Sequence, residues 1–371
     1  MSLRLALVRG PMYDHLYDIF GQSGLDVKIV VHEDHPTLNR RVAEMLGAGE
    51  PLDLISTHAK YAPSQAQWLR PLDDLVDGDV VSGLAPPAVS LCRVEGRTWC
   101  LPRLIDARVM WVRADRVEHA PDTWAELAAG QIVFGFPGRE SGLFGTFFEL
   151  VTGAGGLLFD ENGRPTMDTA QAIDAVELLI RLAERAPQEL VDWHYDEVDL
   201  ALLDGRVDAA AAWPGAWGAI SRSRLGDTLQ PQPYPAGVQR RVSYAGCHAW
   251  AIPRSARDPD GALALLHLLL GAEAQAVDAA GGNICAHSAA LAAVRPVDDR
   301  DRRRLTITRQ TIDDAMITYP QLSRLPEIEE AGWRAINDAL RHRLTATAAV
   351  ARIQQVAHAA LDSMEETEHH R

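Results

Sequence analysis

The chain has 371 residues, 47% of them hydrophobic, and a formal net charge of −15 at pH 7. This length favours two domains, and the excess of acid excludes a nucleic-acid partner, because phosphate contacts need clustered Lys and Arg. No apolar run approaches the roughly 18 to 20 residues that span a bilayer, so we expect a soluble protein.

The N-terminal segment LRLALVRG is too short for the apolar core of a secretory signal. We therefore expect a cytoplasmic protein if the chain is native as given. If a signal peptide has been removed from it, we expect an exported one.

The first hundred residues alternate between apolar strands and amphipathic helices. The βαβαβ order predicts a parallel sheet covered by helices. The expected strands are 3–10, 25–33 and 51–58, with helices at 12–23 and 37–47 between them.

Ligands of such sheets bind beyond the carboxyl ends of the strands. The segments that follow the first and third strands are therefore the places to look for contacts. They contain Arg9, Tyr13, Thr57, Lys60 and Tyr61.

The chain has four cysteines, at positions 92, 100, 247 and 285. Cys92 and Cys100 flank a predicted hairpin turn at Glu95-Gly96, and a two-residue turn would pair Cys92 with Trp99. This pairing places the two thiols on opposite faces of the hairpin. We therefore predict free, buried cysteines, with a disulfide as the alternative.

A second alternation of strands and helices begins near residue 131. Its last strand, 206–213, ends at Trp213, again a position where ligands bind. The other expected elements are a strand at 132–138 and helices at 143–152, 169–186 and 196–203.

Motifs for catalysis, cofactors and metals are absent from the sequence. There is no G-x-G-x-x-G, no phosphate-binding P-loop and no H-E-x-x-H, and Gly138-Arg-Glu-Ser-Gly142 has its serine one place too late for a nucleophile elbow. His32-Glu33-Asp34-His35 follows a strand directly, so alternation splits its side chains between two faces. We interpret this run as a solvated loop and expect no metal, cofactor or catalytic residue.

Seven short motifs in order resemble the family 1 extracellular solute-binding proteins of ABC importers, a group that includes the maltose-binding protein. The resemblance runs from the first strand to about residue 361. The motifs are GEPLDLIS, RVEGRTWCLPRLIDARVMWVRAD, PDTWAELAA, LLDGRVDAAAAWPGAW, SYAGCHAWAIPRSARDPDGA, MITYPQL and Trp333.

The resemblance implies a two-lobed α/β fold, with a mainly parallel sheet flanked by helices in each lobe and a hinge of several strands. The first lobe would comprise residues 1–106 and 252–297, the second 109–249 and 301–361, with a tail at 362–371. Such a protein is a monomer on the periplasmic or extracellular side of the membrane. It closes on a small molecule held in the cleft between the lobes and delivers it to an ABC permease, with no enzymatic activity.

The resemblance also assigns contact residues. Trp213 would stack on a sugar ring, Trp217 would more often lie in the core, and Gly246 and His248 would donate to a ligand hydroxyl. The alternative for His248 is a satisfied histidine in the hinge core. The full predicted set is Arg9, Tyr13, Thr57, Lys60, Tyr61, Asp106, Arg139, Phe144, Trp213, Gly246, His248, Tyr319 and Trp333.

Aromatic residues make up only 6% of the chain, and the loop 57–61 lacks the tryptophan that the maltose-binding protein has there. We therefore predict a carbohydrate or polyhydroxy ligand of mono- or disaccharide size. One alternative is an anionic sugar derivative, such as a sugar acid or a phosphorylated or sulfonated polyol. It rests on Arg9, Lys60, Arg103 and Arg139, unless these residues pair with Asp14, Asp106 and Glu140. A hydrolase that uses Asp106 with Glu140 is the remaining alternative.

Overall fold

The computed structural model describes residues 2–368, so the predicted end of the C-terminal tail, 369–371, lies outside the described residues. The chain forms two compact units. The first comprises residues 1–106 and 246–295, and the second comprises 107–245 and 296–371. Within residues 2–368 no single helix is long and apolar enough to cross a membrane, whereas the bent pair α11 and α12 (Pro259–Leu270 and Ala272–Ala280) passes that test by length and composition.

The sheet of the first unit begins with the three strands that alternation predicted. β1 (Leu3–Val8) lies between β2 (Val27–Glu33) and β3 (Leu54–His58), parallel to both. β11 (Ser243–Ala251) runs antiparallel to β3, and β6 (Leu101–Ala107) pairs with β11. A strand from late in the chain therefore completes the sheet.

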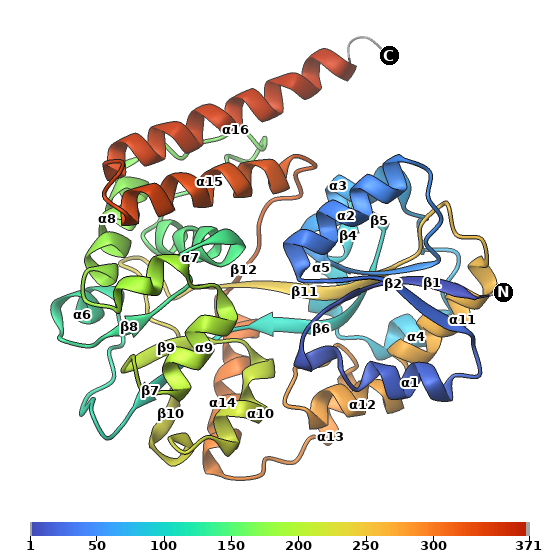
Figure 1. Ribbon diagram of the computed structural model, residues 1–371, viewed down its shortest axis with the longest axis horizontal. Coiled ribbons are helices and arrows are strands. Elements are labelled where there is room, and N and C mark those ends of the chain that lie inside the picture. Colours follow the sequence, from blue (N-terminus) through green and yellow to red (C-terminus); the bar gives the residue numbers. More distant parts are fainter. Residues whose placement is uncertain (1, 369–371) are drawn as a thin grey trace. The chain divides into compact units, whose positions relative to one another are not determined.

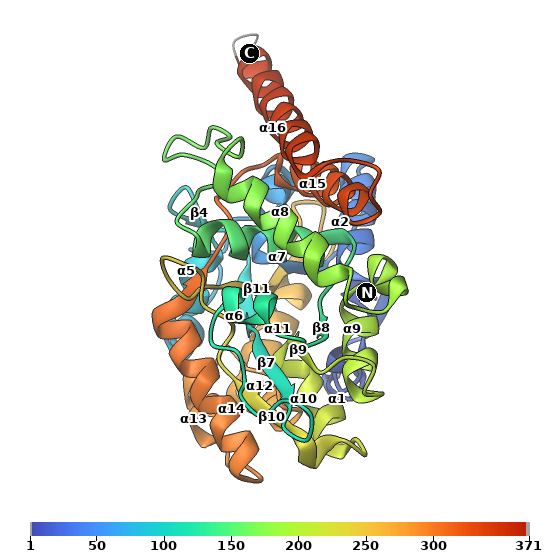
Figure 2. The ribbon, with the colours of Figure 1, turned by 90° about the vertical axis from the view of Figure 1, so that its left-hand side faces the viewer.

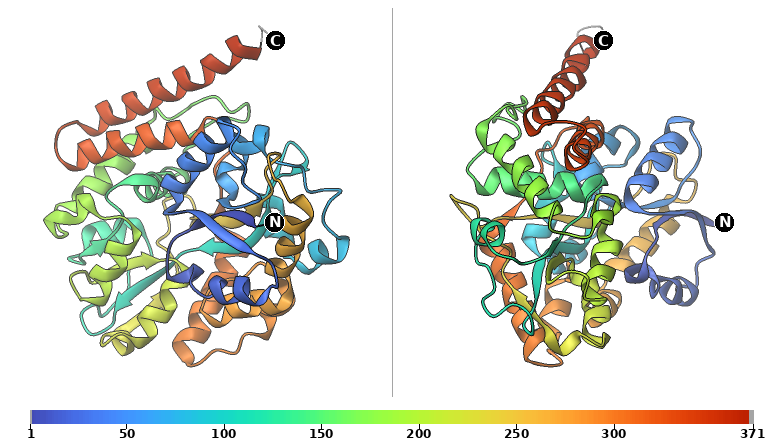
Figure 3. Two further views of the ribbon diagram at one scale, coloured as in Figure 1. Left: turned by 45° about the vertical axis from the view of Figure 1, so that its right-hand side comes forward. Right: turned by 60° about the vertical axis from the view of Figure 1, so that its left-hand side comes forward.

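Helices cover both faces of this sheet (Figures 1 and 3). α2 (His35–Gly47) lies on one face and α1 (Leu16–Gln22) on the other. α2 begins where Asp34 caps it, because the Asp34 carboxylate accepts a hydrogen bond from the Thr37 amide at 3.0 Å. The remaining elements of this unit are α3 (Ala62–Gln65), α4 (Gly78–Gly83), α5 (Pro86–Leu91), β4 (Arg93–Val94), β5 (Arg97–Thr98) and α13 (Ser288–Ala293).

The sheet of the second unit has the strand order β10-β7-β9-β8. The β7–β9 and β7–β10 pairs are antiparallel and only the β8–β9 pair is parallel, so this sheet is mixed, whereas we expected a mainly parallel one. Its strands are β7 (Val109–Arg113), β8 (Phe134–Gly135), β9 (Ala209–Ala212) and β10 (Leu229–Gln232).

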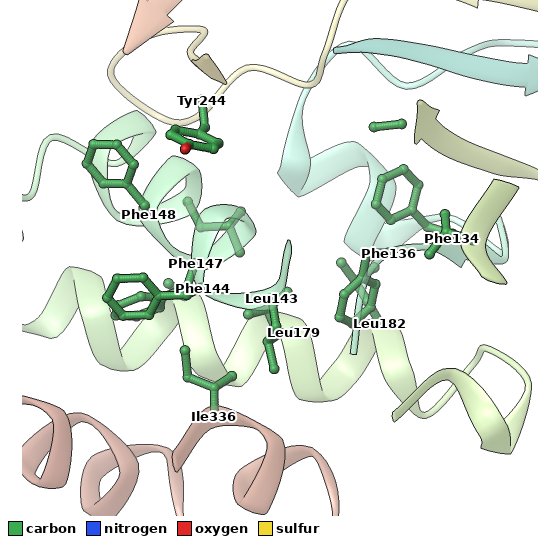
Figure 4. Packing of buried hydrophobic residues seen from close by; sticks show 14 of the residues in the cluster. Phe134, Phe136, Leu143, Phe144, Phe147, Phe148, Leu179, Leu182, Tyr244 and Ile336 are labelled. Atoms are coloured by element: carbon green, nitrogen blue, oxygen red, sulfur yellow. The ribbon is translucent and has the colours of Figure 1, made fainter. Parts of the chain in front are cut away.

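Packed helices form the rest of the second unit, and α7, α8, α15 and α16 lie against one another (Figure 2). α7 (Glu140–Gly153) is almost wholly buried, and its polar residues Thr146 and Glu149 are buried as well. Its Phe144 and Phe147 pack toward Leu179 of α8 and Ile336 of α15 (Figure 4). The other elements are α6 (Trp124–Ala129), α8 (Ala170–Ala183), α9 (Tyr195–Leu203), α10 (Trp217–Arg222), α14 (Asp299–Gln310), β12 (Met316–Ile317), α15 (Leu325–Leu340) and α16 (Ala346–Glu368).

Gly332 of α15 allows the Phe144 ring to pack against the helix backbone, because a Cβ atom at position 332 would lie 2.3 Å from Phe144 Cε2. We expect Gly332→Ala to lower the free energy of unfolding by about 1 to 3 kcal/mol through overpacking. Gly21→Ala is the control, because nothing lies within 4 Å of a Cβ there. Denaturant titration of both variants checks this, and equal midpoints would contradict the packing argument.

Candidate functional site

Five side chains of the first unit meet, some from its strands and some from the segments that follow strands. Tyr13 follows β1, His35 begins α2, His58 ends β3, Asp106 lies on β6 and His248 lies on β11. We call these five residues the histidine cluster. All but His35 are buried, with side chains no more than about a tenth exposed.

His248 contacts each of the other four members. Its Nε2 lies 3.1 Å from Asp106 Oδ2, and its Nδ1 lies 3.1 Å from His35 Nε2. The Tyr13 hydroxyl also contacts His248 Nδ1, and the rings of His58 and His248 have centroids 5.8 Å apart. Three imidazoles, a phenol and a carboxyl therefore present their polar atoms to one another.

Backbone contacts fix the ring of His58. Its Nδ1 accepts a hydrogen bond from the Lys60 amide at 3.2 Å. The ring lies against Gly246, where a Cβ atom would stand 2.1 Å from His58 Cε1. Gly246 is therefore required by the close approach of the ring, whereas its predicted donation to a ligand stays a prediction.

A buried ion pair lies behind Tyr13. Arg103 Nε donates to Asp278 Oδ2 at 3.0 Å, and the Arg103 guanidinium lies 4.3 Å from the centroid of the Tyr13 ring. His15 Nε2 also lies 3.0 Å from Asp278 Oδ1. Arg103 therefore pairs with Asp278, and not with Asp106 as we had considered from the sequence.

Burial controls the protonation of the histidine cluster. It lowers the pKa of His58 and that of His248 well below the usual value, and the neighbouring charges, including His35, act in the same direction. Burial also raises the pKa of the Asp106 carboxyl well above its usual range, although Arg103 opposes this. His58 and His248 are therefore neutral at neutral pH.

Asp106 Oδ2 is buried and accepts no hydrogen bond from the residues that the structure describes. His248 Nε2 is close to this oxygen, but the two groups are not aligned for a hydrogen bond. A buried acceptor without a donor is costly, so this oxygen is suited to receive a hydroxyl from a ligand.

His35 corrects one interpretation from the sequence. It belongs to the run that we interpreted as a solvated loop, yet its ring packs edge-on against His248 at a centroid distance of 4.4 Å. The alternation of side chains between the two faces of a strand does not extend to His35, because β2 ends at Glu33 and α2 begins at His35. Among the described residues, no group of three or more His, Cys, Asp or Glu side chains is arranged to hold a metal ion.

The other predicted residues of the first unit lie around this cluster. Thr57 is buried, and its hydroxyl bonds to Gln65 Oε1 at 2.9 Å. Tyr61 is also buried, and the Lys60 ammonium lies 4.9 Å from the centroid of its ring. Arg9 is exposed to solvent.

In the second unit, Trp213 is half-buried at the carboxyl end of β9. Its ring lies edge-on to Tyr195 and Tyr244, with centroid distances of 5.6 and 6.3 Å, and the Arg108 guanidinium lies 5.2 Å from its centroid. Trp217 is buried and stacks on Trp111 at 5.7 Å, which confirms its predicted place in the core.

Two more predicted residues lie in the aromatic core of the second unit. Tyr319 is buried and stacks on Phe148 at 4.6 Å, and its hydroxyl has no hydrogen-bond partner among the described residues. Phe144 has an exposed fraction of 0%, so its side chain serves the packing of α7 in this structure.

Arg139 and Trp333 line one cavity of about 410 Å³ in the second unit. The guanidinium of Arg139 is paired with Glu140 and lies 3.6 Å from Glu197 Oε1, and Trp333 Nε1 donates to Glu330 Oε2 at 2.9 Å. Both polar groups therefore already have partners on the protein.

Sequence reasoning missed four residues near the predicted contacts. His58 ends β3 and His35 follows the end of β2, so strand ends were the signal that could have found them. Tyr244 lies near the start of β11 and Tyr195 begins α9, and no sequence motif marks them.

We expect the pKa of His58 and of His248 to lie well below 6.5, the usual value, so that both imidazoles are neutral at neutral pH. As the pH falls below about 6.5, the unfolded chain would take up protons that the folded chain does not, so these two histidines then cost stability. His35→Gln should raise the pKa of His248, since His35 helps to lower it. NMR titration of the imidazole nitrogens checks this, and a His248 that is half-protonated at or above pH 6.5 would contradict it.

Comparison with known proteins identifies the chain's relatives. A family model described as bacterial extracellular solute-binding protein matches residues 15–294. The maltooligosaccharide ABC transporter solute-binding lipoprotein of Streptococcus pneumoniae is 23% identical over 200 residues, which cover 49% of this chain and 47% of that protein. The match thus spans about half the length of this curated relative.

Solved structures show the same fold over almost the whole chain. Maltose-bound MalE3 of T. maritima has a TM-score of 0.84 at 21% identity, with 96% of this chain and 98% of that chain covered. A solute-binding protein of Agrobacterium radiobacter K84 in complex with ribitol has a TM-score of 0.85 at 18% identity, covering 96% and 98%. One of Thermotoga lettingae bound with alpha-D-tagatose has a TM-score of 0.85 at 18% identity, covering 97% and 99%.

These likenesses confirm the predicted two-lobed α/β fold. The family model covers about three quarters of the sequence, well beyond any single motif. The chain belongs to the bacterial extracellular solute-binding protein family.

Proposed function

We propose that this protein is the substrate-binding component of an ABC uptake system and that its ligand is a small, neutral polyhydroxy compound. Membership of an extracellular solute-binding family supports the transport role. Three of its structural neighbours are bound to maltose, ribitol and tagatose, all polyhydroxy compounds. In this proposal the protein acts as a monomer outside the cytoplasm and delivers the ligand to a membrane permease.

The observation that carries the proposal is the histidine cluster. A neutral imidazole offers one donor and one acceptor, the Tyr13 hydroxyl offers both, and Asp106 Oδ2 lacks a donor. A sugar or polyol hydroxyl can donate and accept at the same time, so neighbouring hydroxyls satisfy such a mixed set. We therefore propose that the histidine cluster binds ligand hydroxyls and that Asp106 accepts one of them.

The charges in the structure favour a neutral ligand over an anionic one. The anionic alternative depends on loop cations, yet Arg103 is paired with Asp278 and Arg139 with Glu140. The hydrolase alternative has no support either, since Glu140 is already bound to Arg139.

Trp213 keeps its proposed role as a stacking platform. Its indole is half-buried, so part of it stays available to the C–H face of a sugar ring. Tyr195 and Arg108 hold the ring at its buried side.

The test begins with a thermal-shift panel of maltose, ribitol and tagatose. A ligand present at about 100 times its Kd stabilises the folded protein by about 2.7 kcal/mol, which raises Tm by several degrees. Chromatography of the hit after prolonged incubation should return it unchanged. Recovery of a converted product would contradict the transport role.

Variants then locate the contacts. Asp106→Ala and His248→Ala should each weaken binding of the hit by roughly ten- to a hundredfold, because each removes one hydrogen-bonding group from a buried site. His32→Ala is the control, since this exposed histidine contacts only the exposed Tyr17 among the described residues. Calorimetric titration measures the three affinities, and wild-type affinity in both cluster variants would exclude the histidine cluster as the site.

A further inference from the structure

Three of the four cysteines meet inside the first unit. Cys92 ends α5, Cys100 directly precedes β6, and Cys247 lies on β11 beside His248. The Sγ atoms of Cys92 and Cys247 are 3.6 Å apart, although 155 positions separate them in the chain. The thiols of Cys92 and Cys100 also interact, and all three side chains have an exposed fraction of 0%.

This thiol cluster, Cys92, Cys100 and Cys247, corrects the expected hairpin geometry. Trp99 does pair with Cys92, as predicted, through a backbone hydrogen bond of 3.4 Å. However, β5 ends at Thr98, so the alternation of side chains between the two faces of the hairpin does not extend to Cys100. The Cys100 thiol instead interacts with Cys92. Cys285 lies apart from the cluster, where its Sγ contacts the His287 carbonyl at 3.7 Å.

We propose that Cys92 and Cys247 form a disulfide bond when the chain folds in the presence of a disulfide oxidant. Their sulfur atoms lie 3.6 Å apart and must approach one another to reach the disulfide bond length of about 2.05 Å. The family is extracellular, and disulfides form and persist in that environment. All four cysteines are free in the structure, which therefore shows the thiol form of this pair.

The reaction is a thiol–disulfide exchange in two steps. One cysteine loses its proton, attacks the oxidant and forms a mixed disulfide, while one thiol of the oxidant departs. The second cysteine loses its proton and attacks the protein sulfur of that mixed disulfide, so the Cys92–Cys247 bond forms and the second thiol departs. The two protons and two electrons of the cysteines end on the two released thiols.

Burial determines when this exchange takes place. In the folded chain no oxidant reaches the three thiols, and burial raises the pKa of Cys92 and Cys247, which disfavours the reactive thiolates. Oxidation therefore accompanies folding, before β11 covers the cluster. Cys100 is the third thiol of the cluster. When a disulfide first forms with the wrong partner, thiol–disulfide exchange through Cys100 transfers the bond to Cys92 and Cys247.

The bond would anchor β11 to the end of α5, within one unit. Because Cys247 precedes His248, the cross-link lies next to the histidine cluster and holds the strand that supplies its central ring. It would also close a loop of more than 150 residues, and long loops give the largest gain from cross-linking the unfolded chain.

Peptide mapping tests the pairing directly. The protein is denatured and refolded in a mixture of reduced and oxidised glutathione, and free thiols are blocked with N-ethylmaleimide in denaturant. Trypsin then separates the three thiols, because they fall in the peptides 61–93, 98–103 and 242–254. We expect a linked pair of 61–93 with 242–254, and maleimide on Cys100 and Cys285.

Thermal unfolding with and without dithiothreitol during refolding gives a second readout. The reductant should lower Tm by several degrees in the parent and in Cys285→Ser, and it should have no effect in Cys92→Ser or Cys247→Ser. The Tm of each variant is compared with and without the reductant. A packing defect caused by the serine is present in both samples, so it does not contribute to the difference in Tm.

Four maleimide-labelled cysteines after refolding would overturn the proposal, and so would a link between the peptides 61–93 and 98–103. The same holds for a parent whose Tm does not respond to the reductant. None of these outcomes depends on a ligand. The disulfide proposal can therefore fail while the proposed transport role holds, and the reverse is also true.

Discussion

The antiparallel register between β3 and β11 places His58 directly opposite His248, and the candidate site depends on this pairing. Gly246 leaves room for the His58 ring, where any side chain would collide with it. β6 pairs with the same strand β11 and carries Asp106 to His248. A shift of β11 by one residue would turn His248 to the other face of the sheet and separate it from every partner.

Burial then gives this cluster its chemistry. It lowers the pKa of the two buried imidazoles, so they remain neutral hydrogen-bonding groups instead of cations. The cation Arg103 is paired with Asp278 and packs against the Tyr13 ring. In the proposed function, a site with hydrogen-bonding capacity and little positive charge would favour hydroxyls over phosphates or carboxylates.

Alternation and strand order in the sequence predict β1, β2 and β3, and they place Tyr13 and Thr57 near strand ends. They do not predict that His35 and His58 meet His248, because β11 comes from almost two hundred residues later and local patterns carry no information about that pairing. Phe144 shows another limit. Helical spacing puts Phe144 on the same face of α7 as Phe147 and Val151, which predicts a place in the core, whereas the resemblance assigned Phe144 to the ligand.

The most direct test of a neutral polyhydroxy ligand is calorimetry of the best-binding sugar or polyol against its own carboxylate or phosphate derivative, at low and at high salt. The neutral compound should bind at least about tenfold more tightly at both salt concentrations. Tighter binding of the anionic derivative, with an affinity that falls as salt is added, would contradict the account, since it would show unpaired cations at the ligand.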